Sequence, residues 1–134
     1  MTIQKSIVMM TNTGNQYDVV SDKFRSDGYW GNSDGLHTIS VHFQHLVGNF
    51  HVQGTLSIDP QEGDWFDIGI NPTDNRILHV EYDGTTGVNG FSFIGNFTYL
   101  RVKLSRTERL DIAPDNAGRA FPEQGQINKV LLVI

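Results

Sequence analysis

The sequence predicts an all-β protein, an antiparallel β-sandwich of eight or nine strands with a jelly-roll-like arrangement. Three observations predict this fold class. Apolar and polar residues alternate in several short runs, as they do on strands with one buried face. Fourteen glycines, together with many Asn and Asp residues, separate these runs, which is typical of tight turns. A helical pattern is nearly absent, apart from a loose one over residues 105–112 that ends before Pro114.

The first half of the chain predicts two opening strands, a long loop and a hairpin. The opening strands are Ser6–Met10 and Tyr17–Val20, and the polar loop is Ser21–Gly35. Alternation then runs over residues 37–58, interrupted by Val47-Gly48-Asn49-Phe50. Glycine at the first central position suits a type II′ turn, because only Gly adopts the positive φ of that position without a steric clash. We therefore expect a β-hairpin over Ile39–Ile58.

The second half predicts shorter strands and a second Gly-Asn turn. Strands are expected at Trp65–Ile70 and Ile77–Tyr82, followed by a flexible Gly/Thr loop at Asp83–Gly90. Phe91–Ile94 and Phe97–Leu104 form the second hairpin, with a bulge near Phe97. A polar excursion, Asp111–Gln126, precedes the last strand, Ile127–Ile134. This strand is apolar on both faces from Val130 onward, so it is expected in the middle of a sheet or against another subunit.

Size and composition narrow the function classes. A chain of 134 residues predicts one domain, residues 1–134, with a single core. Its longest apolar run is too short for a bilayer span, and the N-terminus lacks the features of a secretory signal. We therefore expect synthesis in the cytoplasm and no membrane partner. The absence of cysteine excludes disulfides, thiolate catalysis and thiolate zinc sites.

Charge argues against a nucleic-acid partner. The net charge is −5, whereas a nucleic-acid-binding domain needs a basic face. The segment richest in cations is Arg101–Arg109, and Glu108 interrupts it. We interpret this segment as a solvated strand end.

One motif resembles a hydrolase nucleophile. Gly31-Asn32-Ser33-Asp34-Gly35 matches Gly-x-Ser-x-Gly, which works where a buried strand turns into a helix. Here a strand is expected next, at Leu36–Gln44, so turn chemistry explains the match. Carboxylate pairs without an enclosing cleft do not support glycoside hydrolysis either. The chain is therefore expected to be no enzyme, with no catalytic residues.

Two kinds of metal site deserve mention, although no cofactor is expected. His42, Gln44, His51 and Gln53 share one face of the predicted first hairpin, where two imidazoles could bind Zn²⁺ or Ni²⁺. A polar sheet face or a subunit contact explains the same pattern. Calcium could bind at either of two acidic loops, which solvated turns also explain. The acidic residues are Asp59, Glu62, Asp64 and Asp67 in one loop, and Asp22, Asp27 and Asp34 in the other.

Aromatic residues in loops suggest a glycan-binding alternative. Tyr29, Trp30 and Trp65 could stack against sugar rings if their faces are exposed. Packing at an edge of the sandwich is the competing explanation, because Trp is mostly buried in folded proteins.

Two parts of the sequence resemble small virion proteins of tailed bacteriophages. "HVQGTLSIDPQEGDWFDI" (residues 51–68) is similar to a pattern in which a strand runs into a Ser/Asp-rich turn, then a Trp and a short strand. "GNFTYLRVKLS" followed by "GQINKVLLVI" is similar to its companion, an aromatic-Leu-Arg strand and a final apolar strand. The Asp111–Gln126 excursion is longer than the turn of that pattern. The resemblance implies a structural virion protein, such as a head decoration, neck or tail component, without catalytic residues.

These observations together predict a non-enzymatic virion subunit that forms homo-oligomers and contacts other virion proteins. Burial against neighbouring subunits would also protect the exposed edges of a sandwich. The interface candidates are Tyr29, Trp30, Val130, Leu132 and Ile134. A carbohydrate-binding module that uses the loop aromatics is the alternative.

Overall fold

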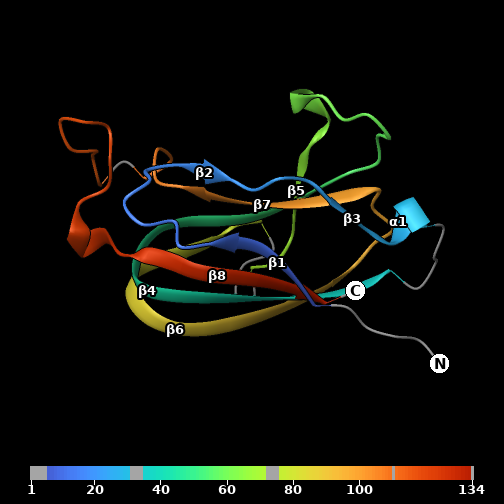
Figure 1. The fold of residues 1–134 in the computed structure, drawn as a ribbon, viewed down its shortest axis with the longest axis horizontal. Coiled ribbons are helices and arrows are strands. Elements are labelled where there is room, and N and C mark those ends of the chain that lie inside the picture. The colour runs from blue at the N-terminus through green and yellow to red at the C-terminus, as the bar shows by residue number, and fades with distance from the viewer. Residues whose placement is uncertain (1–5, 31–34, 72–75, 110, 134) are drawn as a thin grey trace.

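The chain forms a curled antiparallel β-sheet in a computed structural model (Figure 1). The structure describes residues 6–30, 35–71, 76–109 and 111–133, without the side chains of Asp27 and Trp30. Within these ranges the strands are β1 (Ser6–Thr11), β2 (Val19–Val20), β3 (Phe24–Arg25), β4 (Leu36–Thr55), β5 (Phe66–Ile68), β6 (Val80–Ile94), β7 (Tyr99–Ser105) and β8 (Gln126–Val133). The short helical turns are α1 (Asp27–Trp30), η1 (Glu62–Asp64) and η2 (Pro122–Gln124).

Strand β4 is the centre of the sheet. The strand order is β1-β8-β4-β7-β2, with β5 and β6 also paired to β4 and β3 paired to β7. Every described ladder is antiparallel. The predicted all-β antiparallel class and the number of strands are thereby confirmed for the described residues. The sandwich and its jelly-roll-like connections stay predictions, because the strands join into one curled sheet.

The predicted first hairpin is wrong, because β4 runs without a turn through Gly48 and Asn49. Gly48 serves close packing instead: a Cβ there would lie 2.9 Å from Cδ1 of Leu104 and 3.1 Å from Cγ of Arg106. Glycine in a strand commonly marks such an approach. An alternating pattern with one central Gly-Asn therefore describes a long strand as well as a hairpin.

A bulge near His45 bends β4. His45 has φ +50, and the β4–β6 register shifts between Phe43 and Leu46. The extra residue changes the parity of the buried positions from odd numbers, such as Phe43, to even numbers, such as Leu46 and Phe50. The residue just before β8, Gly125, packs against this bulge and must be glycine. Its φ is +67, and a Cβ on it would lie 2.2 Å from the His45 carbonyl oxygen. β4 and β6 therefore curl together at this end of the sheet (Figure 1).

The predicted loop Asp83–Gly90 is wrong as well, since these residues lie inside β6. Gly87 pairs with Phe43 and Gly90 with Ser40, so the long β4 ladder overrides their poor strand propensity. The second Gly-Asn turn also joins no hairpin, because β6 and β7 each pair with β4 in the described ladders. Phe97 lies in the connecting loop rather than in a bulge, and its ring leaves no room for a side chain on Gly95.

Alternation predicts most of the core correctly. Ile39, Val41 and Phe43 are buried on β4, as are the predicted inward residues of β7, Leu100, Val102 and Leu104. Leu56 and Ile58 are exposed, because β4 ends at Thr55 before the predicted strand does. The last strand, β8, lies between β1 and β4, which is the first of the two placements expected for it.

Arg106 contradicts the prediction of a solvated cationic segment. It is fully buried, and its guanidinium donates hydrogen bonds to carbonyl oxygens of Gln16, Val47, Gln124 and Gly125 at 2.5–3.2 Å. Burial lowers the pKa of Arg106 from its ordinary value, and neighbouring Tyr17 and Asp18 oppose this effect. The Arg106 side chain thus joins three parts of the fold: the segment between β1 and β2, the middle of β4 and the residues just before β8.

Candidate functional site

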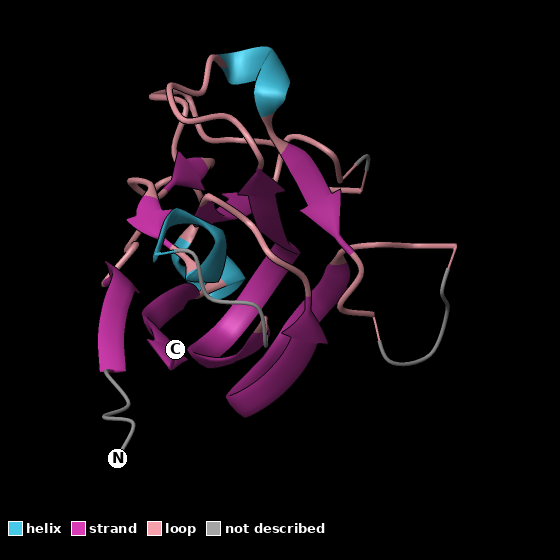
Figure 2. Cartoon of the chain, turned by 90° about the vertical axis from the view of Figure 1, so that its right-hand side faces the viewer, coloured by secondary structure: helices cyan, strands magenta, loops and turns pink. Residues whose placement is uncertain are grey.

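Two regions of the surface stand out, and the first is an apolar end of the sheet near α1. Five exposed apolar residues surround the connection between β6 and β7, and we call them the apolar end: Tyr29, Leu36, Leu56, Phe66 and Ile94. Figure 2 looks onto this end of the sheet. The exposed fractions of Leu36, Leu56 and Ile94 are 57%, 66% and 78%.

Contacts with the β6–β7 connection bring the apolar end together. Leu36 lies opposite Ile94 in the β4–β6 ladder, so the two side chains are neighbours. Gly28, next to Tyr29, donates a backbone hydrogen bond to Phe97 O, and Thr98 Oγ1 donates one to Leu56 O. The Phe66 ring lies 5.9 Å from that of Phe97. Exposed apolar residues from several segments of the chain therefore lie around one connection.

Aromatic packing beneath this surface makes it rigid. The buried rings of His37 and Phe93 stack at 5.1 Å, and the Phe97 ring lies about equally far from both, at 6.1 and 6.2 Å. Nε2 of His37 is hydrogen-bonded to Oγ of Ser26 at 2.7 Å. The apolar end therefore rests on a packed base rather than on a loose loop.

The predicted interface residues separate in the structure. Tyr29 lies at the apolar end, whereas Val130 and Leu132 are fully buried between β1 and β4. As interface candidates Val130 and Leu132 are wrong, because both side chains pack into the core of a single chain. Ile134 and the side chain of Trp30 lie outside the described residues. Ser33, the candidate nucleophile, also lies outside them.

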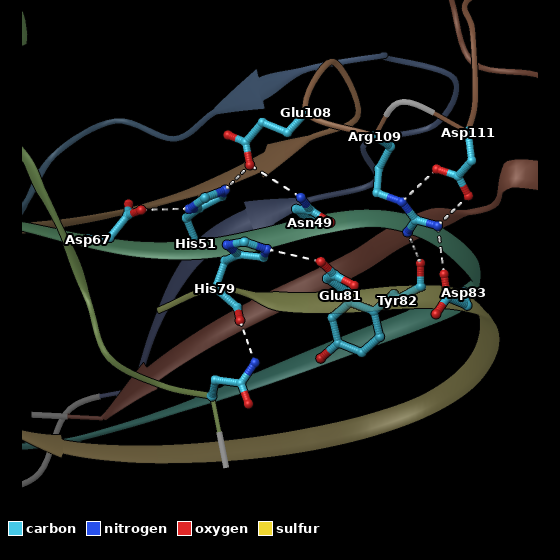
Figure 3. A network of polar contacts seen from close by, with 11 residues as sticks. Asn49, His51, Asp67, His79, Glu81, Tyr82, Asp83, Glu108, Arg109 and Asp111 are labelled. Carbon is cyan, nitrogen blue, oxygen red and sulfur yellow. Dashed lines mark hydrogen bonds and ion pairs between the residues drawn. The ribbon is translucent and has the colours of Figure 1, made fainter. Parts of the chain in front are cut away.

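The second region is a polar group centred on His51, which we call the histidine cluster: Asn49, His51, Asp67, His79, Glu81 and Glu108 (Figure 3). His51 is buried on β4, and both of its ring nitrogens face carboxylates. Nδ1 lies 3.0 Å from Oδ2 of Asp67, and Nε2 lies 2.8 Å from Oε1 of Glu108. A ring nitrogen that carries a hydrogen can donate it to the carboxylate that it faces, since a carboxylate only accepts hydrogen bonds.

His79 adds a second imidazole from another part of the chain. It directly precedes β6, and its ring lies 5.0 Å from that of His51. Its Nε2 lies 3.4 Å from Oε1 of Glu81. Its backbone oxygen accepts a hydrogen bond from the Asn71 amide at 2.8 Å, which helps to fix this segment.

Glu108 connects the cluster to the turn after β7. Burial raises the pKa of Glu108, but hydrogen bonds from Asn49 and His51 outweigh this effect and hold the pKa below its ordinary value. Asn49 Nδ2 donates to Oε1 at 3.2 Å, and Lys103 Nζ lies 3.8 Å from Oε2. Glu108 is therefore ionised under ordinary conditions and offers a fixed negative charge to the two imidazoles.

A further ion-pair network lies beside the histidine cluster along β6 (Figure 3). Arg109 donates to Asp83 Oδ1 and Asp111 Oδ2 at 2.7 Å each and to Tyr82 O at 3.0 Å. Hydrogen bonds to Asp111 and Asp83 raise the pKa of Arg109. This network anchors the segment after β7 to β6.

Arg101 covers one face of the Trp65 ring, where a sugar ring could otherwise stack. Its guanidinium lies 4.4 Å from the Trp65 ring centre and pairs with Oε1 of Glu62 at 2.8 Å. Tyr29 has a comparable neighbour, because the Arg25 guanidinium lies 4.7 Å from its ring centre. A surface depression of about 530 Å³ is lined by Trp65, Glu62 and Lys23, and Arg101 lines it as well.

The predicted acidic loop uses its carboxylates for protein contacts. Glu62 pairs with Arg101, Asp64 accepts a hydrogen bond from the Gln61 backbone at 2.8 Å, and Asp67 contacts His51. Calcium at this loop would compete with those contacts. In the second predicted loop, Asp34 and the Asp27 side chain lie outside the described residues.

The predicted histidine face is right in part. His51 belongs to the cluster, and Gln53 donates to Asp67 Oδ1 at 2.9 Å. His42 and Gln44 lie before the bend of β4 and are not in the cluster, because the hairpin that would bring them opposite His51 does not form. His79 and Glu108 lack any regular spacing to His51 in sequence, so only the tertiary fold identifies them.

Two comparisons with known proteins found no match for the chain. No protein-family model matches it. A search of curated proteins also finds no match. Within the described ranges, no helix is both long and apolar enough to cross a membrane. Function must therefore be inferred from the fold, the two surface regions and the sequence resemblance.

Proposed function

We propose that this chain is a non-enzymatic structural subunit of a virion that assembles through its apolar end, both with copies of itself and with other virion proteins. The observation that carries the proposal is the apolar end: five large, exposed apolar residues from separate segments lie around the connection between β6 and β7, over a packed aromatic base. Apolar surface that gathers in one place on a protein marks an interaction site more often than isolated residues do.

The arrangement of the strands supports the resemblance on which the virion assignment depends. The similar segments correspond to the end of β4 with β5, to β7 and to β8. β4 pairs with each of these three strands, so the segments are neighbours in the sheet. The resemblance therefore agrees with one continuous part of the fold.

The alternative, a carbohydrate-binding module, has weaker support. Its aromatic candidates with described side chains, Tyr29 and Trp65, each carry an arginine over the ring. Sugar stacking would first have to displace a guanidinium, and at Trp65 the Arg101–Glu62 ion pair as well.

Isolation of virus particles that encode this chain tests the proposal. Mass spectrometry of particles purified through a density gradient should detect the protein in multiple copies. The Ile94→Lys variant should be lost from these particles, because it places a charge in the apolar end. Val88→Lys is the matched control, since Val88 is also an exposed apolar residue of β6 but lies opposite His42, away from this end.

Absence of the wild-type chain from the particles, or equal incorporation of Ile94→Lys and Val88→Lys, would contradict the proposal. Binding of purified protein to a glycan array, abolished by Trp65→Ala, would favour the carbohydrate-binding alternative.

A further inference from the structure

The histidine cluster has the ligand types of a transition-metal site. One ring nitrogen from each of His51 and His79 and a carboxylate oxygen of Glu108 lie within 4.8 Å of one another. Zinc bonds of about 2.0–2.2 Å in a tetrahedral site would place such atoms about 3.3 Å apart. Small side-chain rotations would therefore bring the three groups onto one ion, with water as a fourth ligand.

Neighbouring groups already orient both imidazoles. Metal-binding histidines usually donate their second ring N–H to a carboxylate or a carbonyl, which fixes the tautomer and the ring plane. Asp67 takes this position at Nδ1 of His51, and Gln53 holds Asp67 in turn. Glu81 takes the corresponding position at His79, where its Oε1 lies 3.4 Å from Nε2. The cluster thus has supporting contacts as well as potential ligands.

Charge and hydrogen bonding also favour a dication. With neutral imidazoles, the three carboxylates of Asp67, Glu81 and Glu108 and the ammonium of Lys103 sum to −2, which a divalent ion would neutralise. Asn49 is 3% exposed, and its Oδ1 has no hydrogen-bond partner among the described groups. A buried amide oxygen without a partner is costly unless water or an ion satisfies it. An ion-bound water in the cluster would supply such a donor.

We propose that His51, His79 and Glu108 bind one Zn²⁺ ion, which joins β4, the segment before β6 and the turn after β7. Imidazole ligands favour zinc over calcium, which prefers oxygen ligands. The ion takes the place of the proton between Nε2 of His51 and Oε1 of Glu108, and that proton leaves to solvent. The site acts as a structural clamp in a chain without disulfides, and it is independent of the apolar end.

Calorimetric titration of the chelator-treated protein with Zn²⁺ tests this proposal, with any polyhistidine tag removed. One ion per chain should bind. Affinity should fall at least about tenfold in His79→Ala and in Glu108→Gln, because each loses one of three protein ligands. His42→Ala, a histidine on β4 outside the cluster, is the matched control and should bind as the wild type does.

Cobalt provides a second readout. Co²⁺ at the site should give the visible absorption of a tetrahedral complex, which His79→Ala should abolish and His42→Ala should retain. Circular dichroism checks that each variant is folded, and Asp67→Asn replaces His79→Ala if that variant unfolds. No zinc binding by the wild type, or equal affinity in the wild type, Glu108→Gln and a folded His79→Ala or Asp67→Asn, would overturn the proposal.

Discussion

The apolar end and the histidine cluster lie on the same sheet but differ in where their side chains find partners. The histidine cluster has its partners within the chain, whereas the apolar end is exposed. At the histidine cluster, the polar side chains contact one another within the chain, and His51 alone contacts two carboxylates. At the apolar end, Leu36, Leu56 and Ile94 expose more than half of their area and would gain from a partner outside the chain. This difference is the basis of our proposal that the first region stabilises the fold and the second region contacts partners.

The two regions nevertheless share one support. β4 begins at Leu36 in the apolar end and passes through Asn49 and His51 in the histidine cluster. Mutations in the shared support should therefore affect both regions, whereas mutations within one region should leave the other intact. The predictions below follow this reasoning from the largest expected effect to the smallest.

The largest effect is expected for Arg106→Ala. The substitution removes a buried side chain and leaves carbonyl groups of Gln16, Val47, Gln124 and Gly125 without their donor. The free energy of unfolding should fall by about 4 kcal/mol, and both regions should lose order together. Urea unfolding measures the loss. Arg119→Ala, at an exposed arginine, should change stability by less than about 0.5 kcal/mol; an equal loss in both variants would contradict the role of Arg106.

His51→Ala should lower stability by about 2 kcal/mol in metal-free buffer. The substitution leaves Asp67 and Glu108 without the imidazole that contacts both of them. Self-association should persist, because the apolar end is unchanged. Urea unfolding compared with His42→Ala checks the prediction. A His51→Ala variant as stable as the control would show that the cluster contributes nothing without an ion.

Ile94→Lys should show the converse behaviour. Its side chain is 78% exposed, so stability should change by less than about 0.5 kcal/mol. Thermal unfolding of dilute protein, where association is weakest, measures this. A loss of several kcal/mol would mean that Ile94 supports the fold of the monomer rather than a contact with a partner.

The smallest expected effect is a loss of stability at low pH, caused by Asp18, which lies outside both regions. Burial raises the pKa of Asp18, but hydrogen bonds from Thr107 and from the Arg106 backbone outweigh it and keep the pKa below its ordinary value of 3.8. A carboxyl with a lowered pKa stabilises the fold above its unfolded pKa, and this contribution is lost as the pH falls through the folded pKa. Stability should therefore drop below about pH 4, and less steeply in Asp18→Asn. Urea unfolding between neutral and acidic pH tests this; parallel curves would refute it.

Local pattern predicted the fold class and the faces of the strands, but not which strands pair. Ile39, Val41 and Phe43 are buried as their alternation predicts, because period two is a property of any strand. The hairpin turn predicted at Gly48 is wrong, because glycine is equally suited to a turn and to a close contact between a strand and neighbouring side chains. Gly87 and Gly90 join a strand only because β4 is long enough to pair with them.

The two surface regions were predictable only in part for the same reason. Tyr29 and His51 carry local signals, an aromatic in a polar loop and a histidine on a strand face. Glu108 and His79 join the histidine cluster, and Ile94 joins the apolar end, only because the fold brings distant segments together. No spacing in the sequence reveals these contacts. Val130 illustrates the opposite error, in which an apolar pattern suited both a central strand and an interface.

Sedimentation velocity over a range of protein concentrations tests the central claim most directly, namely that the apolar end is where the chain associates. The account predicts that the wild type forms oligomers, that His51→Ala still forms them and that Ile94→Lys is monomeric. A wild type that stays monomeric at every concentration, or an Ile94→Lys variant that associates as the wild type does, would contradict it.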